Sequence, residues 1–255
     1  MLEIKNLSAA YPGKPVLHSL SATIPAGQVT VLLGPNGCGK STLLKTLCGI
    51  IPASGGQILL CGQDLLQLPQ KALAQTVAYL PQNRQVPDMT VEHLVLHGRF
   101  PYLSYPRRYR PQDYAAAHAA MAQLDVLELA DRPLAQLSGG QQQKVYIAMA
   151  LAQDTPVIAL DEPTTYLDIS HQLQLLAQAK ALSAQGKTVL MVAHDIPAAL
   201  RVADHIVLMD SGRTVFQGSA DALFASREAD RVFGISLKRM MTPAGWQYYC
   251  EAAPQ

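Results

Sequence analysis

Nine consecutive residues constrain this chain more than any other feature: Gly34, Pro35, Asn36, Gly37, Cys38, Gly39, Lys40, Ser41 and Thr42. They fit the pattern G-x-x-x-x-G-K-[ST] and lie between an apolar run at 29–33 and a helical stretch at 43–50. That context predicts a phosphate-binding loop, because glycines let backbone N–H groups approach an anion and a helix N-terminus attracts it. Lys40 can reach terminal phosphates and Ser41 can ligate magnesium, whereas the alternative is an ordinary glycine-rich turn.

Length and composition suit one large α/β domain, or one domain with an inserted lobe, since 49% of the 255 residues are apolar. The net charge is only +1, which argues against a nucleic-acid-binding protein that depends on a broad basic surface. The one dense basic run, at 107–110, is interpreted as a solvated loop or as a segment that faces phosphate headgroups or a partner.

The four cysteines, Cys38, Cys48, Cys61 and Cys250, form no C-x-x-C pair and have no matching histidines for zinc. Reduced thiols in a cytosolic protein are therefore expected. Residues 1–5 show no signal-peptide core, and no apolar run approaches the roughly 20 residues that span a bilayer. If the protein works at a membrane, other chains are expected to anchor it. Because Cys38 lies inside the loop, its alkylation is expected to inhibit and a bound nucleotide to protect it.

Apolar runs alternate with helical patterns along the chain. Strand patterns fall at 2–7, 16–24, 29–33, 77–80, 157–160, 188–192, 205–209 and 213–217. Helical patterns fall at 41–48, 91–97, 113–124, 126–130, 141–152, 169–183 and 196–202. Nearly continuous apolar strands separated by helices predict a parallel sheet in an α/β core. No strand pattern lies between 82 and 137, so a helical lobe is expected there, and 236–255 is weakly patterned.

Two adjacent carboxylates, Asp161 and Glu162, end the apolar strand at 157–160. Unpaired charge is costly at the end of a buried strand, so the pair is expected to have a function. Beside a phosphate-binding loop, Asp161 is predicted to hold magnesium through water, and Glu162 to deprotonate the attacking water as the general base. The alternative is a pair of surface acids in a turn.

A second predicted phosphate-binding turn consists of Ser138, Gly139, Gly140 and Gln141. Ser138 is a favourable N-cap for the helix that follows, and the glycines free the backbone to approach an anion. That helix is about 20 Å long and is expected to hold the turn far from the strand that ends in Asp161. Two phosphate-binding segments that lie far apart in one chain predict a head-to-tail dimer, in which each nucleotide contacts the loop of one chain and the turn of the other.

The order of these motifs resembles that of the ATP-binding-cassette ATPases, whose signature is the sequence LSGGQ, here at 137–141. The resemblance covers residues 11 to about 218. It implies that Tyr11 stacks on adenine and that Gln82 ligates magnesium and links the nucleotide to the helical lobe. It also implies that His194 contacts the γ-phosphate, and that Asp168 belongs to a loop that crosses the dimer interface.

The implied fold is a single α/β ATPase domain over 1–235 with a short C-terminal tail at 236–255. It combines a P-loop NTPase core at about 1–82 and 155–235, an N-terminal antiparallel β subdomain, and an inserted α-helical subdomain at about 83–154. Two positions depart from the family pattern: Lys144, where many relatives carry arginine, and Tyr166, in the loop before Asp168. Neither change removes a catalytic group.

Residues 88–92 and 98–102 resemble the helical lobe of bacterial import ATPases for iron chelates, haem and cobalamin. Residues 164–172 resemble the ferric-siderophore branch, whereas 98–102 has the alternative of a generic loop that closes a helix. The resemblance implies an ATP-hydrolysing subunit of an iron-chelate importer, with ATP as substrate and Mg²⁺ as cofactor. The alternatives are the cassette ATPase of an exporter and a non-transport cassette ATPase.

The implied partners are a second cassette subunit, most simply an identical copy, and two transmembrane permease subunits. A periplasmic or surface-tethered substrate-binding protein acts indirectly, and no nucleic acid is involved. The segment 82–110 is expected to receive a coupling helix of the permease. The implied location is peripheral, at the cytoplasmic face of the bacterial inner membrane.

Overall fold

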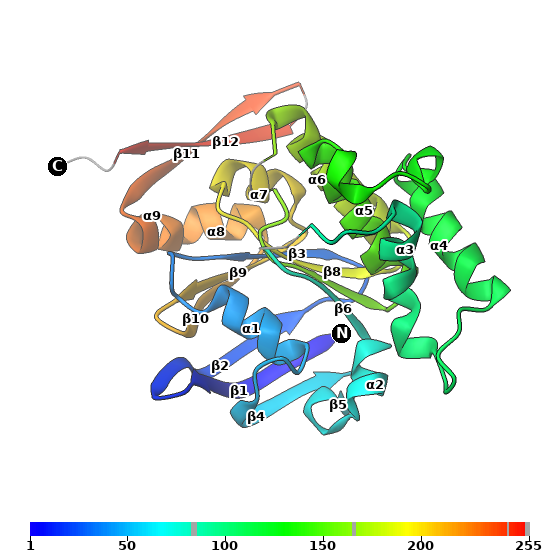
Figure 1. The fold of residues 1–255 in the computed structure, drawn as a ribbon. Coiled ribbons are helices and arrows are strands. Elements are labelled where there is room, and N and C mark those ends of the chain that lie inside the picture. The colour runs from blue at the N-terminus through cyan, green and yellow to red at the C-terminus, as the bar shows by residue number, and fades with distance from the viewer. Residues whose placement is uncertain (83–85, 165–166, 244, 253–255) are drawn as a thin grey trace. The chain divides into compact units, whose positions relative to one another are not determined.

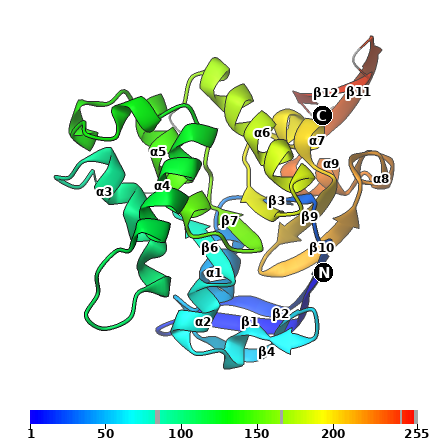
Figure 2. The same ribbon diagram turned by 90° about the vertical axis from the view of Figure 1, so that its right-hand side faces the viewer.

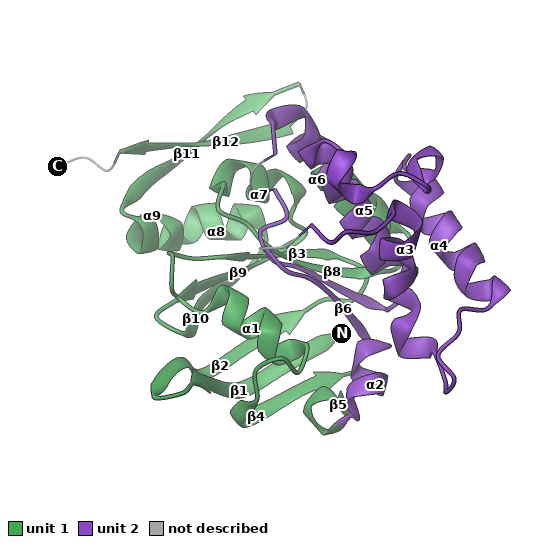
Figure 3. Cartoon of the chain, viewed as in Figure 1, with its two compact units in different colours: residues 1–67, 176–255 green, residues 68–175 purple. Residues whose placement is uncertain are grey.

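The protein is described by a computed structural model that covers residues 1–82, 86–164, 167–243 and 245–252. Figure 1 and Figure 2 show its helices and strands from two sides. The chain forms two compact units (Figure 3): residues 1–67 with 176–255, here the core unit, and residues 68–175, here the helical unit. The expected subdomain boundaries near 82 and 155 stay predictions.

The core unit begins with an antiparallel sheet. Its strands, in the spatial order β2-β1-β4-β5, are β1 (Leu2–Tyr11), β2 (Lys14–Ile24), β4 (Ala53–Leu60) and β5 (Gln63–Asp64). A 3₁₀ turn at Leu65–Gln67 follows. Leu2, Ile4, Leu7 and Ala9 of β1 are buried, which is the alternation expected of a sheet with one face against a core. The predicted antiparallel β subdomain is confirmed.

Four further strands of the core unit carry its parallel part. They are β3 (Val29–Leu33), β8 (Thr188–Val192), β9 (His205–Asp210) and β10 (Arg213–Gly218). β3 pairs in parallel with both β8 and β9, and β10 pairs antiparallel with β9. Every residue of β3 and β8 is buried, as expected for strands covered on both faces. Helices α1 (Lys40–Leu47) and α7 (Ile196–Val202) belong to this unit, and α6 (Ile169–Ala184) ends in it.

The weakly patterned C-terminal tail forms an antiparallel hairpin. After α8 (Ala220–Ser226) and α9 (Glu228–Phe233) come β11 (Ile235–Thr242) and β12 (Gly245–Ala252). The guanidinium of Arg239 lies 4.1 Å from the ring centroid of Trp246 and 4.4 Å from that of Phe224. It also pairs with Asp221 at 2.6 Å. Strand β12 contacts α7 (Figure 1), so the hairpin is attached to the core unit.

The helical unit combines two parallel strands with a group of helices. The strands are β6 (Val77–Leu80) and β7 (Val157–Leu160). The helices are α2 (Gln70–Ala74), α3 (Val91–Leu96), α4 (Pro111–Gln123) and α5 (Gly139–Ala152). Short 3₁₀ segments occupy His97–Tyr102, Leu127–Leu129 and Leu134–Gln136, so the helix predicted at 126–130 is one 3₁₀ turn. Helices α3, α4 and α5 pack against one another (Figure 2).

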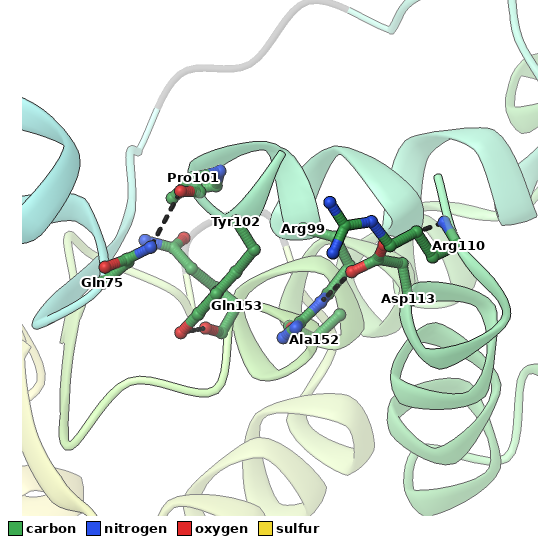
Figure 4. A network of polar contacts seen from close by, with 8 residues as sticks. All are labelled: Gln75, Arg99, Pro101, Tyr102, Arg110, Asp113, Ala152 and Gln153. Carbon is green, nitrogen blue, oxygen red and sulfur yellow. Dashed lines mark hydrogen bonds and ion pairs between the residues drawn. The ribbon is translucent and has the colours of Figure 1, made fainter. Parts of the chain in front are cut away.

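A buried ion pair holds these helices together (Figure 4). Arg99 donates from Nε to Asp113 Oδ1 at 3.2 Å and from a guanidinium nitrogen to the carbonyl of Ala152 at 2.8 Å. Asp113 is 1% exposed and also accepts the backbone N–H of Arg110 at 2.9 Å. Tyr102 donates to the carbonyl of Gln153 at 2.8 Å. The segment 98–102 therefore ties α4 to the end of α5 and is more than a generic loop that closes a helix.

Replacement of Asp113 by alanine is expected to destabilise the protein by about 3–5 kcal/mol, because it leaves the Arg99 guanidinium buried without its carboxylate. Urea unfolding measures the change. Glu128→Ala, at an exposed position, is the matched control and should change stability by less than about 0.5 kcal/mol. Removal of both Arg99 and Asp113 should be milder than the sum of the single changes, and additive losses would contradict a coupled pair.

Among the described residues, no helix has both the length and the apolar character required to cross a bilayer.

Candidate functional site

Two of the predicted site segments belong to the core unit and begin at the same edge of its parallel strands. β3 leads into the glycine-rich loop and β8 leads to His194. Leu32 pairs with Val192 in the parallel register, so both segments follow the carboxyl ends of neighbouring strands, where α/β sheets place their ligands. His194 is exposed. Asp195 caps α7 by accepting the backbone N–H of Ala198 at 2.9 Å.

The loop folds back so closely that its first position requires glycine. At Gly34 the φ angle is +151°, and an added Cβ would lie 2.2 Å from the carbonyl oxygen of Met209 in β9 and 2.7 Å from the sulfur of Cys38. Any side chain there would strike the neighbouring strand. α1 begins at Lys40, directly after the loop, so the loop ends at a helix N-terminus as the motif predicts.

The Lys40 side chain points back into the loop. It is 5% exposed, and its ammonium donates to the carbonyl oxygens of Gly34 at 2.6 Å and of Pro35 at 2.9 Å. The positive charge is therefore placed against the loop backbone. The loop offers both charge and backbone amides to an anion, which is the combination that phosphate groups prefer.

Cys38 occupies the interior of the same loop. Its side chain is 4% exposed. Burial raises the pKa of the Cys38 thiol, and the nearby Lys40 charge opposes this only in part. Because the thiolate is the reactive species, a raised pKa lowers its fraction at neutral pH.

Alkylation of Cys38 is therefore expected to be slow, although it should still inhibit. Iodoacetamide at pH 7.5 should modify the exposed Cys61 well before Cys38, and ATP should slow the Cys38 reaction further. Peptide mass spectrometry of timed samples, read beside ATPase activity, measures both rates. Activity should fall with Cys38 labelling alone, and the Cys38→Ala variant should resist. Fast labelling of Cys38, or full activity after its labelling, would contradict this.

Tyr11 ends β1 and is 41% exposed. It lies in the wall of an open pocket of about 580 Å³. The lining residues are Ala10, Tyr11, Pro12, Lys45, Ile50, Ile51 and Pro52. An exposed ring in an apolar wall has the character required to stack on a flat base, and the adenine contact stays a prediction.

In the helical unit, β6 and β7 bring Gln82, Asp161 and Glu162 to one edge. Leu80 pairs with Leu160 in the parallel register, so the segments that follow the two strands begin at the same edge of the sheet. Nε2 of Gln82 donates to Oε2 of Glu162. The structure thus joins two residues that the sequence separates by 80 positions.

The two carboxylates at this edge have different environments. Asp161 is 3% exposed and accepts a hydrogen bond from the Tyr79 hydroxyl at 3.0 Å. Glu162 is half-buried and has a φ angle of +49°, a region that L-residues with bulky side chains rarely adopt. Strained backbone of this kind is found at functional sites, where the surrounding structure enforces it. Tyr79 has no local motif, so reading the sequence missed it.

The Ser138 turn is capped in the way the sequence predicts. The Ser138 hydroxyl accepts the backbone N–H of Gln141 at 3.3 Å, and the Gln141 side chain accepts the backbone N–H of Ser138 at 3.0 Å. This reciprocal pair is a capping box. It fixes the first turn of α5 through the side chains of the motif itself.

The expectation that α5 separates this turn from the strand end by a helix length is wrong. Gln143, in the first turns of α5, donates to the carbonyl of Pro163 at 2.7 Å. The chain turns back after α5, so that Pro163, which follows β7, lies within hydrogen-bond distance of Gln143. The segment after Asp161 and Glu162 therefore lies next to the start of α5, and helix length alone does not separate the two sets of residues.

Asp168 lies at the start of α6 and is exposed. Its carboxylate accepts the backbone N–H of His171 at 2.9 Å and contacts Nδ1 of the same residue at 2.8 Å. These hydrogen bonds from His171 hold the pKa of Asp168 below its ordinary value. Tyr166, one of the two departures from the family pattern, lies outside the described residues, as does Thr165.

The predicted site residues are thus divided between the two units. The core unit contributes Tyr11, the loop at 34–42 and His194, whereas the helical unit contributes Gln82, 138–141, Asp161, Glu162 and Asp168. Each unit gathers its own members at the carboxyl ends of parallel strands or at a helix N-terminus. Each set supplies part of the chemistry of a phosphate-handling site: the core unit has the glycine-rich loop with a buried lysine, and the helical unit has the paired carboxylates and the Ser-Gly-Gly turn.

Known proteins with similar sequences include ATP-binding proteins of transport and import systems. The achromobactin transport ATP-binding protein CbrD of Dickeya dadantii is 39% identical over 94% of this chain and 90% of its own length. The iron(3+)-hydroxamate import ATP-binding protein FhuC of Bacillus subtilis is 38% identical, with 95% and 91% covered. The ferric enterobactin transport ATP-binding protein FepC of Escherichia coli is 39% identical, with 91% and 86% covered.

Solved structures agree on the fold. A metal-chelate type ABC transporter in an inward-facing conformation matches with a TM-score of 0.84 and 27% identity, over 98% of this chain and 96% of that one. A nucleotide-free ATP-binding cassette of an ABC transporter matches with a TM-score of 0.82 at 24% identity, over 91% and 97%. The ABC transporter family profile matches residues 17–165. Together with the loop at 34–42 and the signature turn at 138–141, these matches show that the chain belongs to the ABC transporter family, as one of its ATP-hydrolysing subunits.

Proposed function

We propose that this protein is the ATPase subunit of a bacterial importer for an iron chelate, and that Glu162 is its general base. The observation that carries the catalytic assignment is the hydrogen bond from Gln82 to Glu162 at the shared edge of β6 and β7. A general base must be held in a fixed orientation toward the water that it deprotonates. Gln82 provides such a hold, and the backbone of Glu162 is itself constrained by its positive φ angle.

The two carboxylates have different proposed roles. Glu162 is half-buried and accepts the proton of the attacking water. The more buried Asp161, whose carboxylate accepts a hydrogen bond from the Tyr79 hydroxyl, would hold the cation. Lys40 neutralises charge on the terminal phosphates, and the backbone amides at 34–42 hold them. His194, which follows the carboxyl end of β8, contacts the γ-phosphate.

The donor set fits Mg²⁺. Ser41 offers a hydroxyl, Gln82 a carboxamide oxygen and Asp161 a carboxylate, and hard oxygen ligands of this kind suit Mg²⁺. Among the described residues, no group of three or more His, Cys, Asp and Glu side chains could hold a metal. A P-loop site relies on hydroxyl, carboxylate and substrate phosphate oxygens instead. When bound, Mg²⁺ neutralises the charge that develops on the phosphates.

The nucleotide is proposed to lie between two copies of the chain. The P-loop of one copy and the turn at 138–141 of the other form each pocket, and Asp168 faces the partner. Support comes from the presence in one chain of two helix N-termini that carry predicted phosphate-binding motifs and from family membership. ATP closes the dimer and hydrolysis reopens it, which is the differential binding that a conformational cycle needs.

The cargo is proposed from the relatives, whose names specify siderophores such as achromobactin and enterobactin. Two permease subunits form the membrane path, and the segment 82–110 receives their coupling helix. A periplasmic or surface-tethered binding protein delivers the chelate. The ATPase then works as a peripheral subunit at the cytoplasmic face of the inner membrane.

Affinity purification from membranes of the source bacterium, followed by uptake assays, tests this proposal. The wild-type chain should be recovered with a polytopic permease, and cells should take up a labelled ferric siderophore in preference to haem or cobalamin. Cells that carry Glu162→Gln should retain the complex and lose uptake. Recovery with ribosomes or DNA, or export of a compound in place of iron uptake, would refute it.

A further inference from the structure

The imidazole of His171 lies between two segments of the proposed site. On one side, Nδ1 lies 2.8 Å from Oδ1 of Asp168. A carboxylate can only accept a hydrogen bond, so Nδ1 is the donor and the ring orientation is set by Asp168. The ring is 36% exposed and the Asp168 side chain 66% exposed, so the pair lies at the surface.

On its other side, the ring rests on the backbone of Gly140. A Cβ added at Gly140 would lie 2.5 Å from Cδ2 and from Nε2 of His171, and 2.9 Å from Cε1. The ring therefore occupies the space that a side chain at position 140 would need. With the ring in this position, glycine at 140 leaves room for the contact between the first turn of α5 and the start of α6.

The contact joins the signature turn at 138–141 to Asp168. The turn is already rigid, because its capping box satisfies Ser138 and Gln141 mutually. Asp168 is also fixed, because its carboxylate accepts the backbone N–H of His171 at 2.9 Å. The His171 side chain connects the signature turn to Asp168, and no local sequence motif predicts that role.

We propose that His171 is a positioning residue for ATP hydrolysis, which keeps the signature turn and Asp168 in one relative position as the dimer closes. The proposal rests on the proposed function, in which both segments meet a second copy of the chain. The signature turn and Asp168 are proposed to contact the same partner surface, so the distance between them must suit that surface. If either is displaced, fewer dimers close in the geometry that hydrolysis requires.

A purely structural role for His171 predicts different behaviour. Exposed ion pairs contribute little to folding. The helix cap is also independent of the ring, since it uses the backbone N–H of residue 171. Any side chain at position 171 except proline keeps that cap. Substitution of His171 is therefore expected to leave the thermal midpoint near that of the wild type and to change turnover.

The test compares three substitutions of His171 in the full-length chain. His171→Ala removes ring and donor, His171→Phe keeps a ring without the donor, and His171→Asn keeps a donor near Asp168 without the ring. His171→Ala should lower kcat by at least about tenfold, with KM and the thermal midpoint unchanged. Phenylalanine should behave like alanine, whereas asparagine should recover part of the loss. Gln174→Ala, at an exposed position of the same helix, should keep wild-type turnover.

A second measurement uses the steric contact itself. Gly140→Ala should lower kcat about as much as His171→Ala, because the added methyl group displaces the ring, and the double variant Gly140→Ala with His171→Ala should lose little more than either single change. Wild-type kcat in His171→Ala, or a change in KM alone, would overturn the proposal, as would losses that simply add in the double variant. A wild-type chain that neither hydrolyses ATP nor dimerises would instead refute the proposed function.

Discussion

Glu162→Gln is expected to lower ATP turnover on the order of a hundredfold or more, as loss of a general base does. The substitution keeps the size of the side chain and its capacity to hydrogen-bond with Gln82, so the local structure should survive. ATP binding should also survive, because the loop at 34–42 and Lys40 are unchanged. The expected phenotype is therefore a protein that binds ATP and does not release phosphate.

Phosphate release under saturating ATP, together with equilibrium binding of ATP, measures both halves of this expectation. The same isosteric change at the exposed Glu128 controls for loss of a carboxylate as such and should leave turnover intact. Hydrolysis at the wild-type rate by Glu162→Gln would remove Glu162 from the role of base. A loss of ATP binding would show that its main role is in the pocket.

Ser138→Arg is expected to abolish ATP-driven dimerisation while the monomer still binds ATP. The substitution removes the hydroxyl that caps α5, which costs about 1 kcal/mol, and places a long cation where the partner's nucleotide is proposed to dock. The P-loop belongs to the core unit, and its own residues are unchanged. Binding and association should therefore separate in this variant.

Light scattering measures the molar mass of the Glu162→Gln chain in the presence of ATP, with and without the added Ser138→Arg change. Gln112→Arg adds the same charge at an exposed position in the first turn of α4 and should leave the dimer intact. If Ser138→Arg still forms an ATP-dependent dimer, the turn at 138–141 does not face the partner's nucleotide.

Much of the fold follows from local pattern. β3, β6, β7 and β8 have the bounds that their apolar runs predict, because strands buried on both faces leave little ambiguity. β4 was missed, since residues 54–57 are exposed and include two glycines, and its pairing with β1 and β5 specifies it. The C-terminal hairpin was missed for a similar reason, since β11 and β12 alternate poorly and are held by contacts such as those of Arg239.

The candidate site likewise combines local contacts, which the sequence predicts, with long-range contacts, which it does not. The Ser138 cap was predictable because its partner lies three residues away. The contacts of Tyr79 with Asp161 and of Gln82 with Glu162 join residues about 80 positions apart, so the sequence predicts only that each lies near a strand end. The hydrogen bond between Gln143 and Pro163 is likewise a tertiary contact, which is why the length of α5 gave the wrong separation.

The most direct test of a pocket shared between two copies is a mixture of two inactive chains. One chain carries Lys40→Ala and keeps its turn at 138–141, and the other carries Ser138→Arg and keeps its P-loop, both with Glu162→Gln. Native mass spectrometry of each chain alone with ATP should show monomers. The mixture should form a heterodimer that holds one ATP, because one complete pocket is then assembled from the intact half of each chain. A mixture that stays monomeric with ATP would contradict the shared pocket.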